Sequence, residues 1–181
     1  GHPLYTAELV SMLLESGAEP ADSEPLPVPP TVQNVVLDRL DRLGDAAGQI
    51  ANALAVFGPG ATVEQLAKAT QLLEADVVAA LGTLARAAFT VEDTQGLISF
   101  RHDVFRQVVL ERLPASRLAY LHRQAYSALV QGVPVPPGPE ASPQPADLSL
   151  LARLVAHAEA GQLWEAAVHW ARAAAAVAER A

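Results

Sequence analysis

The sequence predicts a mainly α-helical protein that contains one small β-hairpin. Of its 181 residues, 51% are hydrophobic and only 5% are aromatic, a composition that favours packed helices over a β-sandwich. Apolar residues recur at intervals of three and four along most of the chain, as they do on the buried face of a helix. Two short segments rich in strand-forming residues interrupt this pattern and predict the hairpin.

The first 30 residues are predicted to form a helix and a linker. Leu4–Ser16 carries apolar residues in helical spacing, and the preceding Pro3 suits the first turn of a helix. Residues 17–30 hold five prolines among acidic residues. Because proline fixes φ and removes an amide donor, we expect this segment to be a stiff, exposed linker.

Residues 31–113 have the element order of a winged-helix domain. Its first four helical segments end with three in succession that lead into two strand-like segments, Phe89–Val91 and Leu97–Phe100, which a polar turn joins. Thr62 with Gln65 is a capping-box signature, and the sequence Gly58-Pro59-Gly60 indicates a break between helices. The helical segments are Thr31–Leu43, Asp45–Phe57, Thr62 to Gln71 or Leu72, Glu74–Ala88 and, after the hairpin, Arg101–Leu113.

The rest of the chain is predicted to be a connecting helix, a loop and a helical hairpin. Residues 114–131 form the connecting helix, which starts after Pro114. Residues 132–146 contain six prolines and no periodicity, so they are expected to be a loop. In residues 147–181, helices over Asp147–Ala160 and Gln162–Arg180 flank Gly161.

The sequence offers no support for catalysis, a bound cofactor or a metal site in this segment. It lacks a glycine-rich phosphate loop, a nucleophile elbow, and histidines at metal-ligand spacing. It also lacks cysteine, which excludes disulfides and fits a reducing, cytoplasmic setting. No apolar stretch is long enough for a membrane span, and no membrane partner is expected. Gly1 in place of Met indicates a processed, tagged or excised segment.

The charge distribution disfavours DNA as a partner. The chain has a net charge of −8, and residues 62–100 contain two basic side chains against five acidic ones. The helix predicted over Glu74–Ala88 presents mainly Ala, Val and Leu, whereas base edges are read by Arg, Asn or Gln. A winged-helix transcription factor that binds DNA is nevertheless one alternative function, and a helical protein-interaction scaffold is a second.

One stretch of the chain is basic, and it also carries a family resemblance. The basic side chains are Arg101, Arg106, Arg112, Arg117 and Arg123. They fit either a solvated face of two helices or a functional surface. The motif Phe-Arg-His-Asp-Val-Phe-Arg-Gln at 100–107, with residues 111–114 and 121–123, resembles the signal-transduction ATPases with numerous domains (STAND). Within this class the chain is most similar to the large ATP-binding regulators of LuxR type and to predicted ATPases fused to bacterial cyclases or kinases.

The resemblance implies contacts with a nucleotide that a larger protein would bind. Residues 1–5 resemble the family's Gly-x-Pro motif at the end of the nucleotide-binding region (1–16), so Pro3 would lie near the adenine of ADP or ATP. His102 would face the β-phosphate of ADP, and Asp103 fits a His-Asp pair of related ATPases. Arg101 departs from the methionine that is frequent there. From the residues alone, His102 equally fits a helix cap formed through its ring.

The C-terminal helices resemble the start of a tetratricopeptide-repeat arm. Gly161 lies at the turn, and Ala166, Trp170 and Ala173 have small-large-small spacing. Trp164 and Trp170 are both expected in the core. By resemblance, the winged helix would sense the nucleotide state through the upstream nucleotide-binding domain of the same protein. The arm would bind a protein or small-molecule inducer, and the segment itself would be non-catalytic.

Overall fold

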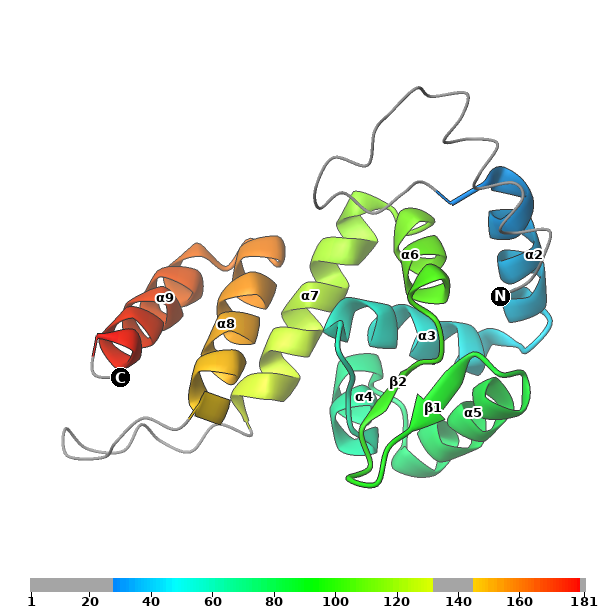
Figure 1. Ribbon diagram of the computed structural model, residues 1–181, viewed down its shortest axis with the longest axis horizontal. Helices are drawn as coiled ribbons and strands as arrows, with labels where there is room; N and C mark the ends of the chain where they lie inside the picture. The colour runs from blue at the N-terminus through cyan, green and yellow to red at the C-terminus, as the bar shows by residue number, and fades with distance from the viewer. Residues whose placement is uncertain (1–27, 132–144, 180–181) are drawn as a thin grey trace.

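The structure, a computed structural model, describes residues 28–131 and 145–179. These residues form eight helices and one two-stranded sheet (Figure 1), which confirms the mainly α prediction. Pro3 and the helix predicted over Leu4–Ser16 lie outside the described residues, as do residues 17–27 of the linker and 132–144 of the loop. The helices are α2 (Pro30–Asp41), α3 (Asp45–Phe57), α4 (Val63–Thr70), α5 (Glu74–Arg86), α6 (Asp103–Glu111), α7 (Ala115–Val130), α8 (Pro145–Ala160) and α9 (Trp164–Ala178).

Helix α2 begins at a proline and buries one side. Its apolar residues Val36 and Leu40 are buried. The predicted linker was expected to be exposed up to residue 30, and this is wrong for its end, because Val28 and Pro29 are buried. The Gln33 side chain accounts for the placement of this end, since its Nε2 donates a hydrogen bond of 3.0 Å to the carbonyl oxygen of Val28.

Helix α3 is the central helix of the fold. It packs against α2, α4, α5, α6 and α7. Five of its eight buried residues are alanine or valine, which lets the neighbouring helices approach closely. The buried residues are Ala47, Ile50, Ala51, Ala53, Leu54, Ala55, Val56 and Phe57. The predicted bounds, Asp45–Phe57, match the observed helix.

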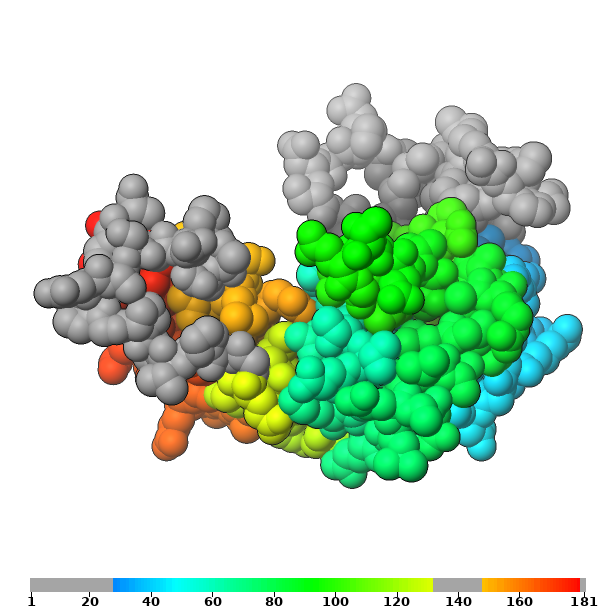
Figure 2. Space-filling view, turned by 90° about the horizontal axis from the view of Figure 1, so that it is seen from below, coloured from blue at the N-terminus to red at the C-terminus, as the bar shows by residue number. Residues whose placement is uncertain are grey.

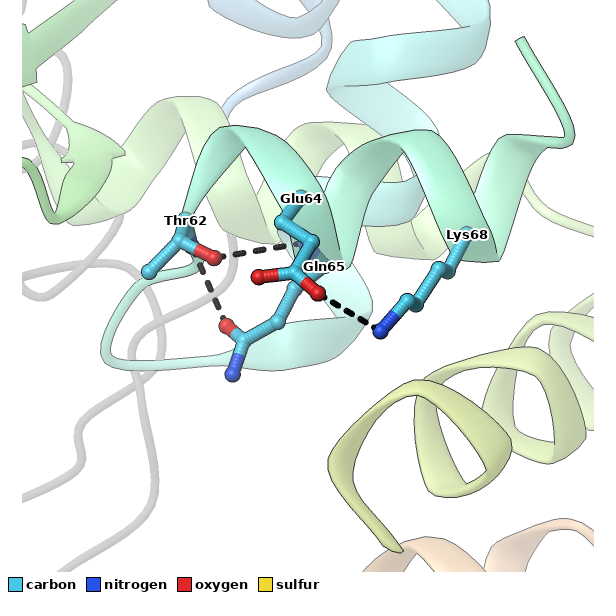
Figure 3. A network of polar contacts seen from close by, with 4 residues as sticks. All are labelled: Thr62, Glu64, Gln65 and Lys68. Carbon is cyan, nitrogen blue, oxygen red and sulfur yellow. Dashed lines mark hydrogen bonds and ion pairs between the residues drawn. The ribbon is translucent and has the colours of Figure 1, made fainter. Parts of the chain in front are cut away.

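The turn between α3 and α4 lies against the sheet. Gly58 and Gly60 both have positive φ, and a Cβ on Gly60 would lie 2.8 Å from the carbonyl oxygen of Ile98. The next residue, Ala61, exchanges two backbone hydrogen bonds of 2.9 Å with Ile98. Helix α4 then starts with the predicted capping box (Figure 3): the Thr62 hydroxyl accepts from the Gln65 amide, and the Gln65 side chain accepts from the Thr62 amide.

The hairpin consists of β1 (Thr90–Glu92) and β2 (Ile98–Phe100), paired antiparallel with Thr90 opposite Phe100. Its turn is held by Asp93, whose Oδ1 accepts hydrogen bonds from two backbone amides, those of residues 95 and 97. Ile98 is buried, and Phe89, just before β1, is also buried. The strand signals predicted the hairpin, and the structure shows that it packs against α3 and α5.

Helix α7 lies between the α8–α9 hairpin and most of the other elements (Figures 1 and 2). It packs against α3 and α4 on one side and against α8 on the other. Helix α8 begins at Pro145, so the last two residues of the predicted loop are helical. Helix α9 begins at Trp164 and not at Gln162, whose backbone is left-handed with φ of 61°. In the described part of the chain, no helix has the length and apolar character of a membrane span.

The two tryptophans of α9 have different environments. The indole N–H of Trp170 donates a hydrogen bond of 3.0 Å to the hydroxyl of Tyr126 on α7, and its ring packs against the core. Trp164 is 65% exposed, so its predicted place in the core is wrong. As the first residue of α9, it projects from a helix whose apolar contacts are made by residues further along, such as Ala167 and Trp170.

Candidate functional site

His102 and Asp103 lie where the chain leaves β2 and enters α6. His102 is the residue that precedes the helix, with an extended backbone, and Asp103 is the first helical residue. A carboxylate in this position interacts favourably with the positive end of the helix dipole. Both residues are exposed, as is the neighbouring Arg101. The three side chains therefore form a polar, accessible corner next to the hairpin.

The His102 ring does not cap α6. Its position before the helix is the one expected of a cap, but its side chain makes no capping hydrogen bond. Instead the ring contacts Phe105 edge-on, with centroids 5.3 Å apart. Phe105 in turn packs on the buried ring of Phe89 at 4.9 Å. The ring-cap interpretation is therefore wrong, and the imidazole is positioned by an aromatic row that extends into the core.

Arg106 fixes this corner to the central helix. Its Nε donates a hydrogen bond of 3.0 Å to the carbonyl oxygen of Ala55 in the last turn of α3. Carbonyls in that turn lack helical partners and carry partial negative charge, so a guanidinium is a favourable neighbour. Arg106 Nη1 also lies 3.9 Å from Asp103 Oδ1. The polar corner is therefore held on a rigid part of the fold.

The basic stretch 101–123 does not form one solvated face. Arg112 pairs with Asp41 of α2 at 2.7 Å, and Arg123 donates to the carbonyl oxygen of Gly161 at 3.1 Å. The guanidinium of Arg117 lies over the ring of Tyr120. The arginines at 106, 112 and 123 therefore tie separate elements together, and such long-range contacts are not visible in the spacing of charges along the chain.

A second polar cluster, which the sequence reasoning did not identify, joins α7 to α8. The Nδ1 atoms of His122 and His157 lie 3.0 Å apart. His157 is only 4% exposed, and its ring contacts Phe57 at the end of α3 with a centroid distance of 6.0 Å. The sequence did contain one indication of this cluster. His157 has helical spacing with the apolar residues Leu154 and Ala158, which places a histidine on a buried helix face.

Both histidines are held in the neutral form at neutral pH. Burial, with smaller contributions from His122 and Arg153, lowers the pKa of His157 to about 4. Burial also lowers the pKa of His122, with a smaller effect from Arg106. With both rings neutral, the Nδ1–H of one donates to the Nδ1 lone pair of the other. A further proton would make one ring an imidazolium cation, which is disfavoured because the site is buried and lies near Arg106 and Arg153.

Arg153 brings α8 to the same end of α3 that Arg106 contacts. Its Nη2 donates a hydrogen bond of 3.1 Å to the carbonyl oxygen of Gly60, while its Nε is buried without a partner. Burial lowers the pKa of this guanidinium, although a guanidinium remains charged at any ordinary pH. Residues 55–60 are therefore contacted by cationic side chains from both α6 and α8.

Among the described residues, no group of three or more His, Cys, Asp or Glu side chains could hold a metal ion. A cleft of about 400 Å³ lies between α2 and α3 and contains neither His102 nor the histidine pair. Its lining is mostly polar: Leu40, Asp41, Gly44, Asp45, Gly48, Gln49, Asn52 and Arg112.

The outer side of α5 is apolar and acidic. Val78 is 55% exposed, Ala79 is exposed, and Arg86 is the one basic residue of the helix. This agrees with the composition predicted for that surface.

Comparisons with protein-family models, with curated proteins and with solved structures give no match. The features of this chain that bear on its function are therefore the geometry of these residues and the motif at 100–107.

Proposed function

We propose that this chain is a non-catalytic regulatory segment of a cytoplasmic, nucleotide-dependent signalling ATPase of the STAND class. In this proposal, a winged-helix domain senses whether ADP or ATP is bound to the upstream nucleotide-binding domain of the same protein. The α8–α9 hairpin begins an arm that binds a protein or small-molecule inducer. ADP bridging the two domains would hold a resting state, and loss of that bridge would release it.

The observation that carries the proposal is the exposure of His102 and Asp103 on a rigid junction. The ring of His102 is not used as a cap of its own helix, and Phe105 and Arg106 fix the backbone beside it. An imidazole N–H that is accessible and well positioned suits a charge-assisted hydrogen bond to a phosphate oxygen. This is the contact that the motif at 100–107 implies for the resting state.

The element order supports the winged-helix part of the proposal. Helices α3, α4 and α5 precede the hairpin, and the segment between α3 and α4 pairs with the hairpin through Ala61 and Ile98. A β-bridge in this place, followed by two helices and a two-stranded wing, fits the arrangement of winged-helix domains. The pairing joins residues 37 positions apart and was not part of the sequence prediction.

The packing of the C-terminal hairpin supports the proposal that it begins a helical-repeat arm. Helices α8 and α9 pack together closely, with Ala158 and Ala167 buried between them, and α8 in turn packs on α7. Alanines at such contacts permit the short interaxial distances of helical repeats. Its exposed side carries Trp164 and Val168, apolar side chains of the kind that protein partners contact.

DNA recognition has less support. The helix that would enter the major groove is α5, and its exposed residues Val78 and Ala79 cannot read base edges through hydrogen bonds. Its first turn carries Glu74 and Asp76, which would repel phosphates. No observation in the described residues favours the transcription-factor alternative or a pure scaffold over the regulatory role.

The proposal is tested by substituting His102 in the intact protein. A charge-assisted hydrogen bond is worth about 1.5 to 3 kcal/mol, so His102→Ala is expected to speed ADP release more than tenfold and to raise inducer-independent output. Asp103→Ala should act in the same direction, more weakly. His169→Ala, which removes an exposed histidine on α9, is the matched control. Unchanged ADP release and unchanged basal output in a folded His102→Ala protein would refute the nucleotide-sensing role.

A further inference from the structure

One of the polar contacts that join the α8–α9 hairpin to the rest of the protein is made by two histidines. On α8, His157 contacts the His122 ring of α7 and the Phe57 ring of α3. Other hydrogen bonds across this interface run from Arg153 to Gly60, from Arg123 to Gly161 and from Trp170 to Tyr126. Of these groups, the two histidines are the ones that can change charge between pH 7 and pH 4.

We infer that the His122–His157 pair is a proton-dependent latch: it holds the α8–α9 arm against α7 and α3 while neutral, and releases the arm when either ring gains a proton. In the neutral pair the two Nδ1 atoms, 3.0 Å apart, share one proton. One added proton leaves that hydrogen bond in place but puts a positive charge on a pair in which His157 is only 4% exposed, and an unpaired charge is costly in a buried site.

The surroundings offer no anion to stabilise the charged form. The cations facing the pair are Arg106 from α6, Arg123 from α7 and Arg153 from α8, and no carboxylate contributes to the pKa of either histidine. The acidic side chains on the adjacent elements are exposed, and Glu64 of α4 is paired with Lys68. The exposed acidic residues are Glu64, Asp103, Glu111, Glu159 and Glu165, and the other titratable groups on α9 are the exposed His169 and Arg172.

The direction of the pH effect follows from the lowered pKa. In the released arm His157 is solvated and titrates near its ordinary value of 6.5, whereas in the docked arm it titrates at about 4. Docking is therefore strongest above pH 6.5 and weakens as the pH falls from 6.5 towards 4. For His157 alone, the docking equilibrium should weaken on the order of a hundredfold across this window. The latch does not require a bound nucleotide, so it is testable in this chain and stands apart from the proposed function.

The test measures the position of the arm in a doubly spin-labelled chain. The sequence contains no cysteine, so Ala75→Cys on α5 and Ala175→Cys on α9, both at exposed positions, give two unique labels. We expect one distance population at pH 7.5 and a second, longer one between pH 6.5 and 4, while circular dichroism still reports folded helices. A single distance population throughout, or loss of helix over the same window, would overturn the latch.

Two phenylalanine variants distinguish release through His157 from non-specific effects of low pH. His157→Phe keeps an aromatic ring beside Phe57 but cannot gain a proton, so the arm should stay docked down to pH 4. His169→Phe, the matched control on α9, should behave as the wild type. If His157→Phe does not fold, His122→Phe at the less buried position takes its place. In the unsubstituted chain, imidazole pKa values of 6.5 or above for both histidines by NMR would also overturn the proposal.

Discussion

Trp170 on α9 donates an indole hydrogen bond of 3.0 Å to the hydroxyl of Tyr126 on α7, which links two helices that flank α8. The contact is partly buried, so its loss leaves an indole N–H without a good partner. We expect Tyr126→Phe to lower the free energy of unfolding by about 1 kcal/mol, measured by urea denaturation. Tyr120→Phe, on the same helix, keeps its ring beneath Arg117 and should change stability by less than about 0.5 kcal/mol. Equal effects of the two variants would show that the hydrogen bond contributes nothing.

The capping box of α4 makes a separate contribution to stability. Thr62→Ala removes the hydroxyl that accepts from the Gln65 amide and should cost about 1 kcal/mol. Thr62→Ser retains an equivalent oxygen and should stay within a few tenths of a kcal/mol of the wild type. Thermal denaturation of the three proteins decides between them. The cap would be unimportant if the serine variant were destabilised as much as the alanine variant.

Two glycines should respond to alanine in opposite ways. Gly48 lies inside α3 with no heavy atom within 4 Å of an added Cβ, so Gly48→Ala should stabilise the protein by about 0.5 to 1 kcal/mol. Gly60 has φ of 149° and the Ile98 carbonyl oxygen only 2.8 Å from an added Cβ. Gly60→Ala should therefore destabilise by more than about 1 kcal/mol. Chemical denaturation of both variants checks the signs, and the same sign for both would contradict the turn geometry.

The α5 surface predicts an absence of sequence-dependent DNA binding. Its exposed residues are mainly apolar or acidic, and only Arg86 is available to contact a phosphate. Fluorescence anisotropy with mixed duplexes should therefore show at most weak retention at low salt, which disappears at physiological salt. Submicromolar, sequence-dependent binding at physiological salt would favour the transcription-factor alternative.

The parts of the fold that could be predicted from the sequence depend on short-range signals. The bounds of α3 follow from the apolar spacing within Asp45–Phe57 and from the glycines on either side. The capping box needs only Thr62 and Gln65, three residues apart. The hairpin follows from two strand-like runs and the turn residues between them. In each case the determining residues lie within about 15 positions of one another.

The features that could not be predicted join distant parts of the chain. The contact of Arg106 with Ala55 spans 51 positions, and that of His122 with His157 spans 35. Each depends on which helices meet and at what angle, and one sequence does not specify this. The burial of Val28 and the exposure of Trp164 belong to the same class, because local patterns identify an apolar residue but not the neighbour that covers it.

The place of α7 between α8 and the α3–α4 pair has a consequence for amide hydrogen exchange. Helix α9 is packed mainly on α8, so it can open while the other elements remain native, and its amides should exchange through a low-energy local opening. Helix α8 should open next, since it has α7 as its main support. The amides of α7 require both packed faces to separate and should exchange only through global unfolding. Successive isotope-exchange steps would then progress inwards from the C-terminal end, with α7 as the boundary of the most protected cooperative unit.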